Sequence, residues 1–466
     1  MQSIKSLLMV FILIGISIVP AMAIEGIQFD FHGNMLQTVG VTTTSLVLAG
    51  KHKSASTDFF SYNGELNIKG FEKVDKYMNL FNSVGTTFGL TKARLRFEAE
   101  TDNHLAKFVY GLEVGTYNWG DKENKFGLSG DGINQESRFA YAEIKTPQSP
   151  IQHTIRMGLQ PTDLSDWVWS ETAAGLTYHG KNGSLNWMMG WYRGDENAET
   201  NSTDNNYLVV KMQNDLSPSI NITGYCIYEH AGSETTETNI RNKKHTYDRN
   251  NYFIGSRINY QTDQFFTDLE FVYQGGDIQF QNDINDEKFD DLDRNAHLIN
   301  LNLGFHVNKK LTLTFNSLFV SGDDNPNDKD IDNFDAIDVD VKIGMILFKD
   351  SLTSSCDRFV SDAPYLLDYG LIHHALIAEY KPNKDHKFYS AIRFLSTAVD
   401  IDIDKNNKHA IGTELDFKYA YKLYKFITLK FEAACLFPDD AADLMTSDGK
   451  EAEPILNVVT GIQFKF

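Results

Sequence analysis

The order of the connections between extended segments constrains this chain more than any other feature of its sequence. Short polar turns alternate with long loops that are acidic or rich in glycine. The short turns include 102–104, 147–150, 181–183, 215–218, 308–310 and 381–385. A β-sandwich or a propeller has no reason to alternate so regularly, whereas a transmembrane barrel has short turns at one rim and long loops at the other. The order therefore predicts a membrane-spanning antiparallel β-barrel.

The number of extended segments agrees with such a barrel. We expect about eighteen strands, with sixteen as the alternative, because single-chain bacterial barrels have an even strand number. The expected strands are 27–47, 86–101, 105–119, 136–147, 151–160, 172–180, 184–194, 205–214, 219–231, 250–261, 264–277, 294–306, 311–321, 370–381, 386–397, 408–422, 425–437 and 455–466.

Single segments alternate apolar and charged residues with the period of a strand. In 92–100, KARLRFEAE, the apolar residues face one side and the charged residues face the other. A buried core would not accept so many charges unless that interior were wet. We therefore expect the apolar side chains to face lipid and the charged ones to line an aqueous lumen. Closure of the barrel also satisfies the backbone of every strand, which lipid demands.

The first 23 residues have the pattern of a secretory signal peptide. Lys5 provides the positive region, 7–19 is an apolar run, and 21–23 is a small-x-small cleavage site. A transmembrane helix is less favoured, because a span needs about 20 apolar residues. We expect residues 24–466 to form a single barrel that is exported through the periplasm to the outer membrane of a Gram-negative cell.

Charge and composition exclude several classes of function. The formal net charge of −20 opposes nucleic-acid binding, and three cysteines are too few and odd in number for a disulfide scaffold. No Gly-x-Ser-x-Gly elbow occurs, and His373 and His374 point to opposite faces of a strand, so they would not chelate one metal. We expect neither an enzyme nor a cofactor.

The chain ends on a large aromatic residue at the end of an apolar strand face. Leu456, Val458, Thr460, Ile462, Phe464 and Phe466 share that face. This ending resembles the C-terminal signal of bacterial outer-membrane barrels, in which a final strand closing on Phe is recognised by the outer-membrane assembly machinery. The resemblance implies that Phe466 is the assembly signal of this chain.

Three further stretches resemble known barrels. Residues 118–147 followed by 155–164 are similar to part of the trimeric porins of sulfate-reducing bacteria. Residues 316–334 resemble a Ser-Gly-Asp-Asp loop common to those porins and to the alginate-export barrel family, and VTGIQFKF at 459–466 matches both. The resemblance implies passive diffusion of small hydrophilic solutes and ions through a homotrimer. The expected surroundings are outer-membrane lipid and lipopolysaccharide. The long first loop, 48–85, departs from the family pattern.

Two alternatives stay open. A dedicated exporter of an acidic, alginate-like polysaccharide would want a strongly basic lumen. The sequence instead directs acids inward as well: Glu98, Glu113, Glu143, Asp268, Glu270, Glu414 and Asp416. A soluble periplasmic sugar-binding β-protein is the alternative if the alternation has another cause.

The functional part of a porin is its constriction. We expect bases on the early strands to line its wall, and acids on the connection 161–171 to face them if that loop folds inward. Opposed charges across a narrow aqueous passage would create a transverse field that sorts permeants by charge. If the loop does not fold inward, its acids belong to an exterior loop. The residues concerned are Arg94, Arg96, Lys107, Arg156, Asp163, Asp166 and Glu171.

One acidic loop, 322–340, has the alternating carboxylates of a calcium loop. Asp328, Asp330 and Asp332 have the spacing, but the sixth position is Asn333 rather than Gly and the twelfth is Val339 rather than Glu. The loop is therefore no EF-hand. We favour a solvated exterior loop, with a looser Ca²⁺ site or divalent bridging to lipopolysaccharide as the alternative.

Overall fold

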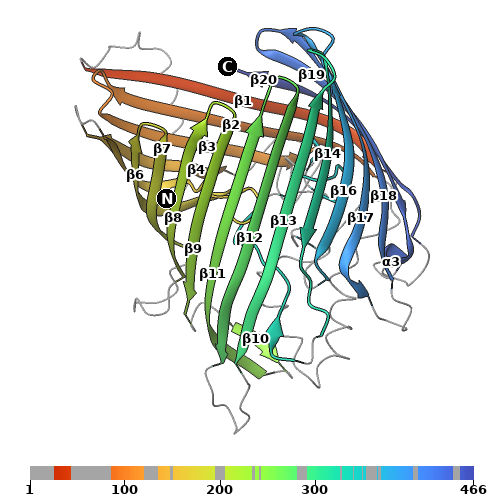
Figure 1. Cartoon of the computed structure of the whole chain (residues 1–466). Coiled ribbons are helices and arrows are strands. Elements are labelled where there is room, and N and C mark those ends of the chain that lie inside the picture. The colour runs from red at the N-terminus through yellow and green to blue at the C-terminus, as the bar shows by residue number, and fades with distance from the viewer. Residues whose placement is uncertain are drawn as a thin grey trace, which may run out of the picture.

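The described chain forms a closed antiparallel β-barrel of eighteen strands, which confirms the predicted fold class and strand number (Figure 1). The computed structural model describes residues 26–42, 86–119, 135–146, 151–194, 205–232, 237–240, 243–280, 291–325, 328–339, 341–348, 350–352, 365, 369–401, 408–443 and 452–466. The predicted signal peptide over 1–23 and the long first loop over 48–85 lie outside these residues.

The barrel strands follow one another in chain order, and each pairs with the next. They are β1 (Ile27–Thr42), β2 (Thr86–Thr101), β3 (Ala106–Asn118), β4 (Gln135–Lys145), β5 (Gln152–Pro161), β6 (Thr172–Asn182), β7 (Leu185–Arg193), β8 (Asn206–Ser217), β9 (Ile220–Ala231), β11 (Lys243–Gln261), β12 (Phe265–Phe280), β13 (Leu292–His306), β14 (Leu311–Val320), β16 (Leu371–Tyr380), β17 (His386–Ile401), β18 (Lys408–Tyr424), β19 (Ile427–Pro438) and β20 (Ile455–Lys465).

Three short elements lie in the loops of the described chain. β10 (Glu237–Ile240) pairs with β11, β15 (Asp330–Ile331) pairs in parallel with β13, and α3 (Asp440–Asp443) follows β19. Among the described residues no helix is long and apolar enough to cross a membrane.

Strand β11 begins seven residues before the predicted boundary of 250, and β12 extends past its predicted end at 277. The two strands stay hydrogen-bonded from Asn250 opposite Asp277 out to Tyr247 opposite Phe280. The additional residues on β11 are mostly polar. Apolar alternation therefore predicts the part of a strand that meets lipid and underestimates the part that projects beyond it.

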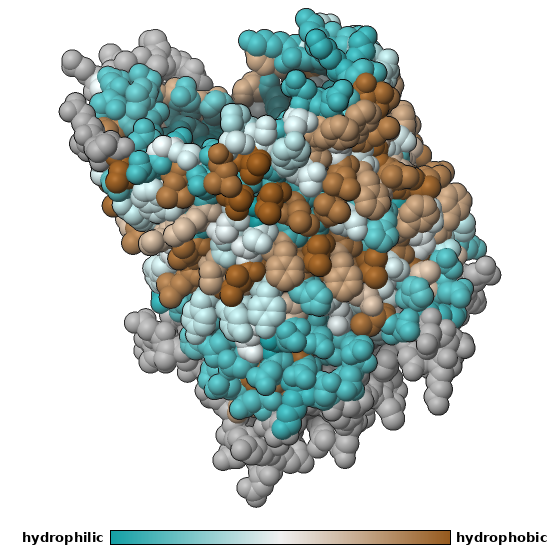
Figure 2. Space-filling model, viewed as in Figure 1, coloured by the Kyte–Doolittle hydropathy of each residue, from teal (hydrophilic) through white to brown (hydrophobic). Residues whose placement is uncertain are grey.

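The outer surface carries an apolar band. Figure 2 shows hydrophobic side chains gathered across the middle of the molecule, between hydrophilic ends. Met157 is 63% exposed and Ile144 is 61% exposed, values that a water-soluble surface would rarely combine in neighbouring strands. Such a band is what a lipid-facing barrel wall requires.

The barrel closes between its first and last strands. Strand β20 pairs with β1 from Asn34 opposite Lys465 to Thr42 opposite Asn457. Beyond this ladder, Phe466 exchanges two backbone hydrogen bonds with Gly33, of 2.8 and 3.0 Å. The Phe466 ring covers the position where a side chain at Gly33 would lie, and it stands 5.8 Å from the Phe31 ring. The terminal aromatic thus fills the outer surface beside the closing strand pair, while its role in assembly stays a prediction.

Two loops enter the barrel and build an apolar core inside it. One is the β5–β6 loop (162–171), and the other is the β14–β16 loop (321–370), described in part. Phe334 of the second loop packs against Phe253 of β11 and against Tyr365, with ring centroids 6.1 and 5.8 Å apart. The loop that we expected to be a solvated exterior segment over 322–340 is therefore partly buried. Its apolar residues, rather than its many acids, decide its position.

Candidate channel constriction

Basic side chains form a row on the lumen side of β2 to β5. Arg94 and Arg96 lie on β2, Lys107 on β3 and Arg156 on β5. The outward neighbours of Arg156, Ile155 and Met157, are 49% and 63% exposed, so Arg156 points to the opposite face of the sheet. The predicted strand phase agrees with this placement. We call these strands the open wall.

Glutamates of the same strands neutralise these bases. Glu113 of β3 accepts from Arg94 and from Lys92, each at 2.5 Å. Glu98 contacts Arg96 at 2.6 Å and also contacts Lys107. The counter-charge that we expected from the adjacent loop is therefore supplied mainly by neighbouring strands.

The third carboxylate of the open wall, Glu143 of β4, holds the remaining predicted base. Arg156 reaches one Glu143 oxygen with Nε at 3.2 Å and with Nη2 at 2.9 Å. The same guanidinium lies 4.9 Å from the centre of the Tyr141 ring. Two contacts to the carboxylate and one to an aromatic face fix the orientation of this arginine.

Arg138 also belongs to the open wall, although the sequence pattern did not predict it. Its guanidinium contacts Glu113 at 3.0 Å and Glu171 of the β5–β6 loop at 3.2 Å. A bulge shifts the pairing of β3 with β4 between Gly111 and Leu112, which leaves Arg138 as the additional residue. Strict alternation places Arg138 on the lipid side, so only the bulge brings it into the lumen.

The arginines of the open wall keep contact with solvent despite their partners. The side chain of Arg94 is 44% exposed, and that of Arg96 is 41% exposed. A hollow of about 550 Å³ opens on this part of the wall. Its lining mixes lumen-side residues such as Arg94 and Arg96 with residues of the outer surface such as Gly33 and Phe466. The exposure of Arg94 and Arg96 themselves means that permeant ions can reach fixed positive charge here.

The β5–β6 loop folds inward and crosses the lumen. Its Ser165 hydroxyl donates to Glu270 of β12 at 2.6 Å, although β12 is far around the barrel from β5. Lys211 of β8 donates to the Asp163 and Leu164 carbonyls. The Trp169 ring packs between Tyr192 and Tyr207, with centroids 5.2 and 4.5 Å away. The inward arrangement is thus the one that the described residues adopt.

The three acids of this loop lie in different surroundings. Glu171 joins the open wall through Arg138. Asp163 and Asp166 are exposed, and Asp163 has a left-handed backbone with φ of 47°. Among the described residues no ion pair links either of these two acids to Arg94, Arg96 or Arg156. Their effect on the passage would act through water rather than by contact.

The β14–β16 loop forms backbone contacts with the β5–β6 loop inside the barrel. Trp169 and Asp338 form an isolated β-bridge, and the Ile337 amide donates to the Val168 carbonyl at 2.9 Å. The Tyr365 hydroxyl donates to the Trp167 carbonyl at 2.6 Å. Backbone contacts between the two loops give both a fixed position inside the barrel.

The calcium candidates lie on the acidic part of the β14–β16 loop. Asp328 accepts from the side chain of Asn325 at 2.7 Å and from the Asp330 amide at 3.0 Å. Burial and the neighbouring carboxylates raise the pKa of Asp332. The described residues contain no group of three or more histidine, cysteine or acidic side chains placed to hold a metal ion. The loop's affinity for Ca²⁺ stays an open prediction.

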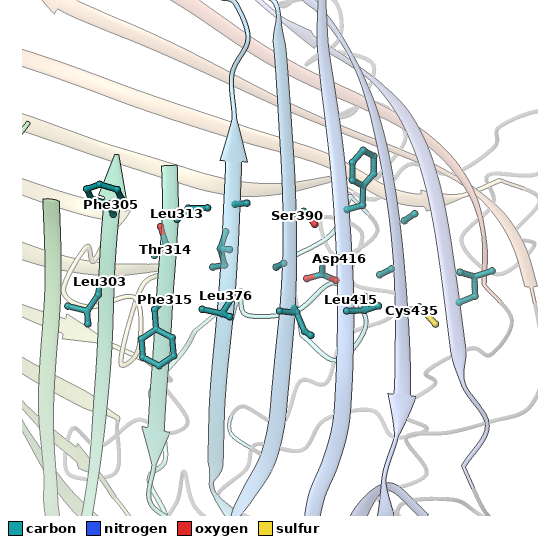
Figure 3. A pocket seen from close by; sticks show the side chains of 18 residues that line it. Leu303, Phe305, Leu313, Thr314, Phe315, Leu376, Ser390, Leu415, Asp416 and Cys435 are labelled. Atoms are coloured by element: carbon teal, nitrogen blue, oxygen red, sulfur yellow. The ribbon is translucent and has the colours of Figure 1, made fainter. Parts of the chain in front are cut away.

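A second hollow, of about 780 Å³, lies on the outer side of the barrel (Figure 3). Its lining comes from neighbouring strands between β13 and β20, and most of it is outward apolar side chains such as Leu376, Leu415 and Phe417. This hollow therefore belongs to the lipid-facing surface and not to the passage.

Comparison with known proteins agrees on architecture. No family model and no curated protein matches this sequence. OpdK of Pseudomonas aeruginosa, solved with vanillate, is 8% identical, with a TM-score of 0.50 and coverage of 94% of this chain and 98% of that one. OccAB2 of Acinetobacter baumannii is 11% identical, with a TM-score of 0.48 and coverage of 93% and 98%. OccK8 (OprE) of Pseudomonas aeruginosa is 9% identical, with a TM-score of 0.48 and coverage of 94% and 98%. At 8% identity the likeness to OpdK shows the fold alone.

Proposed function

We propose that this protein is an outer-membrane porin, a passive diffusion channel for small hydrophilic solutes and ions. One observation carries the proposal. A row of solvent-accessible arginines lines one wall of a closed barrel, and an inward loop narrows the lumen beside it. Solved barrels of this architecture include outer-membrane channels, which supports the same assignment.

The charge pattern favours a diffusion channel over an exporter of acidic polysaccharide. The bases of the open wall share it with Glu98, Glu113 and Glu143, each in an ion pair. A polyanion moving along this wall would meet carboxylates as often as guanidinium groups. Small ions and neutral solutes do not need a continuous basic track. A homotrimer in outer-membrane lipid, with lipopolysaccharide around the acidic loops, belongs to this proposal.

A planar-bilayer recording tests the function directly. Purified, heat-modifiable protein should insert as stepwise, ohmic conductance events, and its reversal potential in a salt gradient should give its charge preference. Liposomes containing the protein should swell in small neutral sugars. Bilayers that remain closed despite insertion of folded barrel would contradict the proposal. Strong block by an acidic oligosaccharide, with no swelling in neutral sugars, would favour the exporter. Crosslinking in native membranes tests the trimer separately.

A further inference from the structure

Part of the lumen side of β16 to β19 is built from polar and charged residues that are nevertheless buried. His373, Arg393, Glu414, Asp416 and Glu432 all point inward, and each is at most 7% exposed. Figure 3 labels Asp416 beside Leu415 on β18; Leu415 is 43% exposed on the lipid side, whereas Asp416 is 3% exposed on the other. A water-filled pore has such a wall, but an apolar core does not. We call it the covered wall.

An apolar piece of the β14–β16 loop provides the cover. This plug segment, residues 341–348 and 350–352, places its apolar side chains in the interior of the barrel. Val341, Ile343, Met345, Ile346, Leu347, Phe348 and Leu352 are each at most 6% exposed. Leu352 packs in a cluster with Leu36 of β1, Leu90 of β2 and Val459 of β20. The segment therefore extends along the inside of the barrel from the covered wall, past the adjoining β20, to β1 and β2.

Two wall carboxylates hold the backbone of the plug segment. Glu414 accepts from the amides of Met345, Ile346 and Leu347 at 2.5, 3.0 and 3.4 Å. Glu432 accepts from the Leu352 amide at 2.7 Å and from the Ser351 hydroxyl at 3.0 Å. Several donors thus converge on each of the two glutamate side chains, so each holds its stretch of the plug segment through more than one hydrogen bond. The attachment thus rests on two inward residues of neighbouring strands.

Asp350 of the plug segment adds a reciprocal attachment. Its carboxylate lies 2.8 Å from Lys418 and 3.7 Å from Arg393, both on the covered wall. Arg393 in turn contacts Asp416 at 2.6 Å. The carboxylate of the plug segment therefore meets two bases of the wall, one of which also pairs with an acid of the wall.

The covered wall keeps polar atoms that the plug segment leaves without partners. Within the described residues, Nδ1 of His373 and Oδ1 of Asp416 are buried and have no hydrogen-bond partner among the protein's own atoms. Buried polar atoms are normally paired with protein or with water. Water can satisfy both atoms, so this wall is chemically suited to an aqueous lining.

We propose that Glu414 and Glu432 are positioning residues that hold the plug segment inside the barrel. When they release it, the covered wall becomes a second aqueous lining beside the open wall. The residues thereby set how much of the lumen conducts. The expected change in conductance rests on the proposed channel function, whereas the attachment of the plug segment does not.

Thiol accessibility tests the structural part without any need for conduction. Ala434 lies on the lumen side of β19 within the buried core and is 2% exposed. An Ala434→Cys reporter, in a chain with its three native cysteines replaced by serine, should react slowly with a charged methanethiosulfonate. Adding Glu414→Ala and Glu432→Ala should accelerate labelling about tenfold or more, because the pair removes several hydrogen bonds and one alone is worth up to about that factor. Glu414→Gln and Glu432→Gln should give an intermediate rate.

Matched controls separate release of the plug from general loosening. Ala420 lies on the lumen side of β18, as Glu414 does, but outside the buried core. Ala420→Cys should therefore react at the same rate with and without the anchor substitutions. Glu379→Ala removes another inward acid of β16, paired with Lys381 and Lys387, and should leave Ala434→Cys protected. Faster labelling at both reporters, or with Glu379→Ala, would mean that the whole barrel had loosened and would overturn the proposal.

A second variant leaves every wall charge in place. A Cβ at Gly344 would lie 3.0 to 3.3 Å from the Glu414 carboxylate, so a larger side chain there should separate segment from anchor. Gly344→Val should accelerate the labelling of Ala434→Cys, as Glu414→Ala with Glu432→Ala should. It provides the test if that double variant fails to fold. Unchanged protection in both variants would overturn the proposal. Unit conductance should rise alongside labelling. If labelling accelerates while no variant conducts, the positioning role stands and the channel function fails.

Discussion

The open wall and the covered wall lie in one sheet and use the same chemistry, yet their arginines lie in opposite surroundings. Arg94 pairs with Glu113 at 2.5 Å and keeps 44% of its side chain exposed. Arg393 pairs with Asp416 at 2.6 Å, and only 3% of its side chain is exposed. Neither strand phase nor partner explains this difference. Whether a loop segment lies over the wall decides it, so the loops determine which lumen residues can meet a permeant.

The largest expected effect concerns stability. Arg393→Met leaves Asp416 without its cation inside the covered wall, whereas Asp350 keeps Lys418; removing one partner of a buried ion pair costs about 3–5 kcal/mol. Arg94→Met removes a half-exposed cation from Glu113, which keeps Lys92 and Arg138 as partners, so we expect a cost of about 1 kcal/mol or less. Urea titration in lipid vesicles, with heat-modified gel mobility as the readout of folding, measures both. Equal losses would remove the distinction between the walls.

For ion selectivity we expect the reverse: substitutions in the open wall should have the larger effect and Arg393→Met the smaller one. Reversing Arg94 or Arg156 to glutamate changes the fixed charge by two units. At roughly 8 Å in water this is worth about 1 kcal/mol, which raises the local cation concentration about fivefold and lowers the local anion concentration by the same factor. The reversal potential should move toward cations, whereas Asp163→Asn with Asp166→Asn should move it toward anions. Arg393→Met should leave it nearly unchanged. A conducting pore that ignores the arginine reversals would exclude these residues from the constriction.

The smallest effect concerns pH and the loop that supplies the cover. Burial and the carboxylates around it raise the pKa of Asp323 from 3.8 to about 6. The folded loop therefore binds a proton more tightly than the unfolded chain does, so its stability is greatest below about pH 4 and falls as pH rises through 6. Hydrogen exchange of residues 321–332, corrected for intrinsic rates, should show greater protection at pH 4.5 than at pH 7.5. Asp323→Asn should abolish that difference, and a pH-independent wild type would contradict the assignment.

Period-two alternation was sufficient to predict the strands, their order and the lumen side of Arg94 and Arg156, because lipid on one side and water on the other impose it directly. It failed at Arg138, where one bulge between β3 and β4 reverses the facing of a residue. It also could not place the plug segment. A sequence signal existed, since residues 341–348 are apolar apart from Lys342 and directly follow the acidic stretch 322–340 that was expected to meet water. The partners of that run, Glu414 and Glu432, are distant in the chain and look like ordinary pore-lining acids.

The anchoring of the plug segment through main-chain amides has a consequence for evolution and for engineering. Glu414 contacts the backbone of Met345, Ile346 and Leu347, so replacing their side chains leaves its hydrogen bonds in place. Substitutions at these three positions can therefore change the volume that the plug segment fills inside the barrel, while its attachment to Glu414 stays the same. A library randomised at these three positions should yield folded barrels with a range of pore widths. Its members should differ in the solutes that they admit and share the same fold.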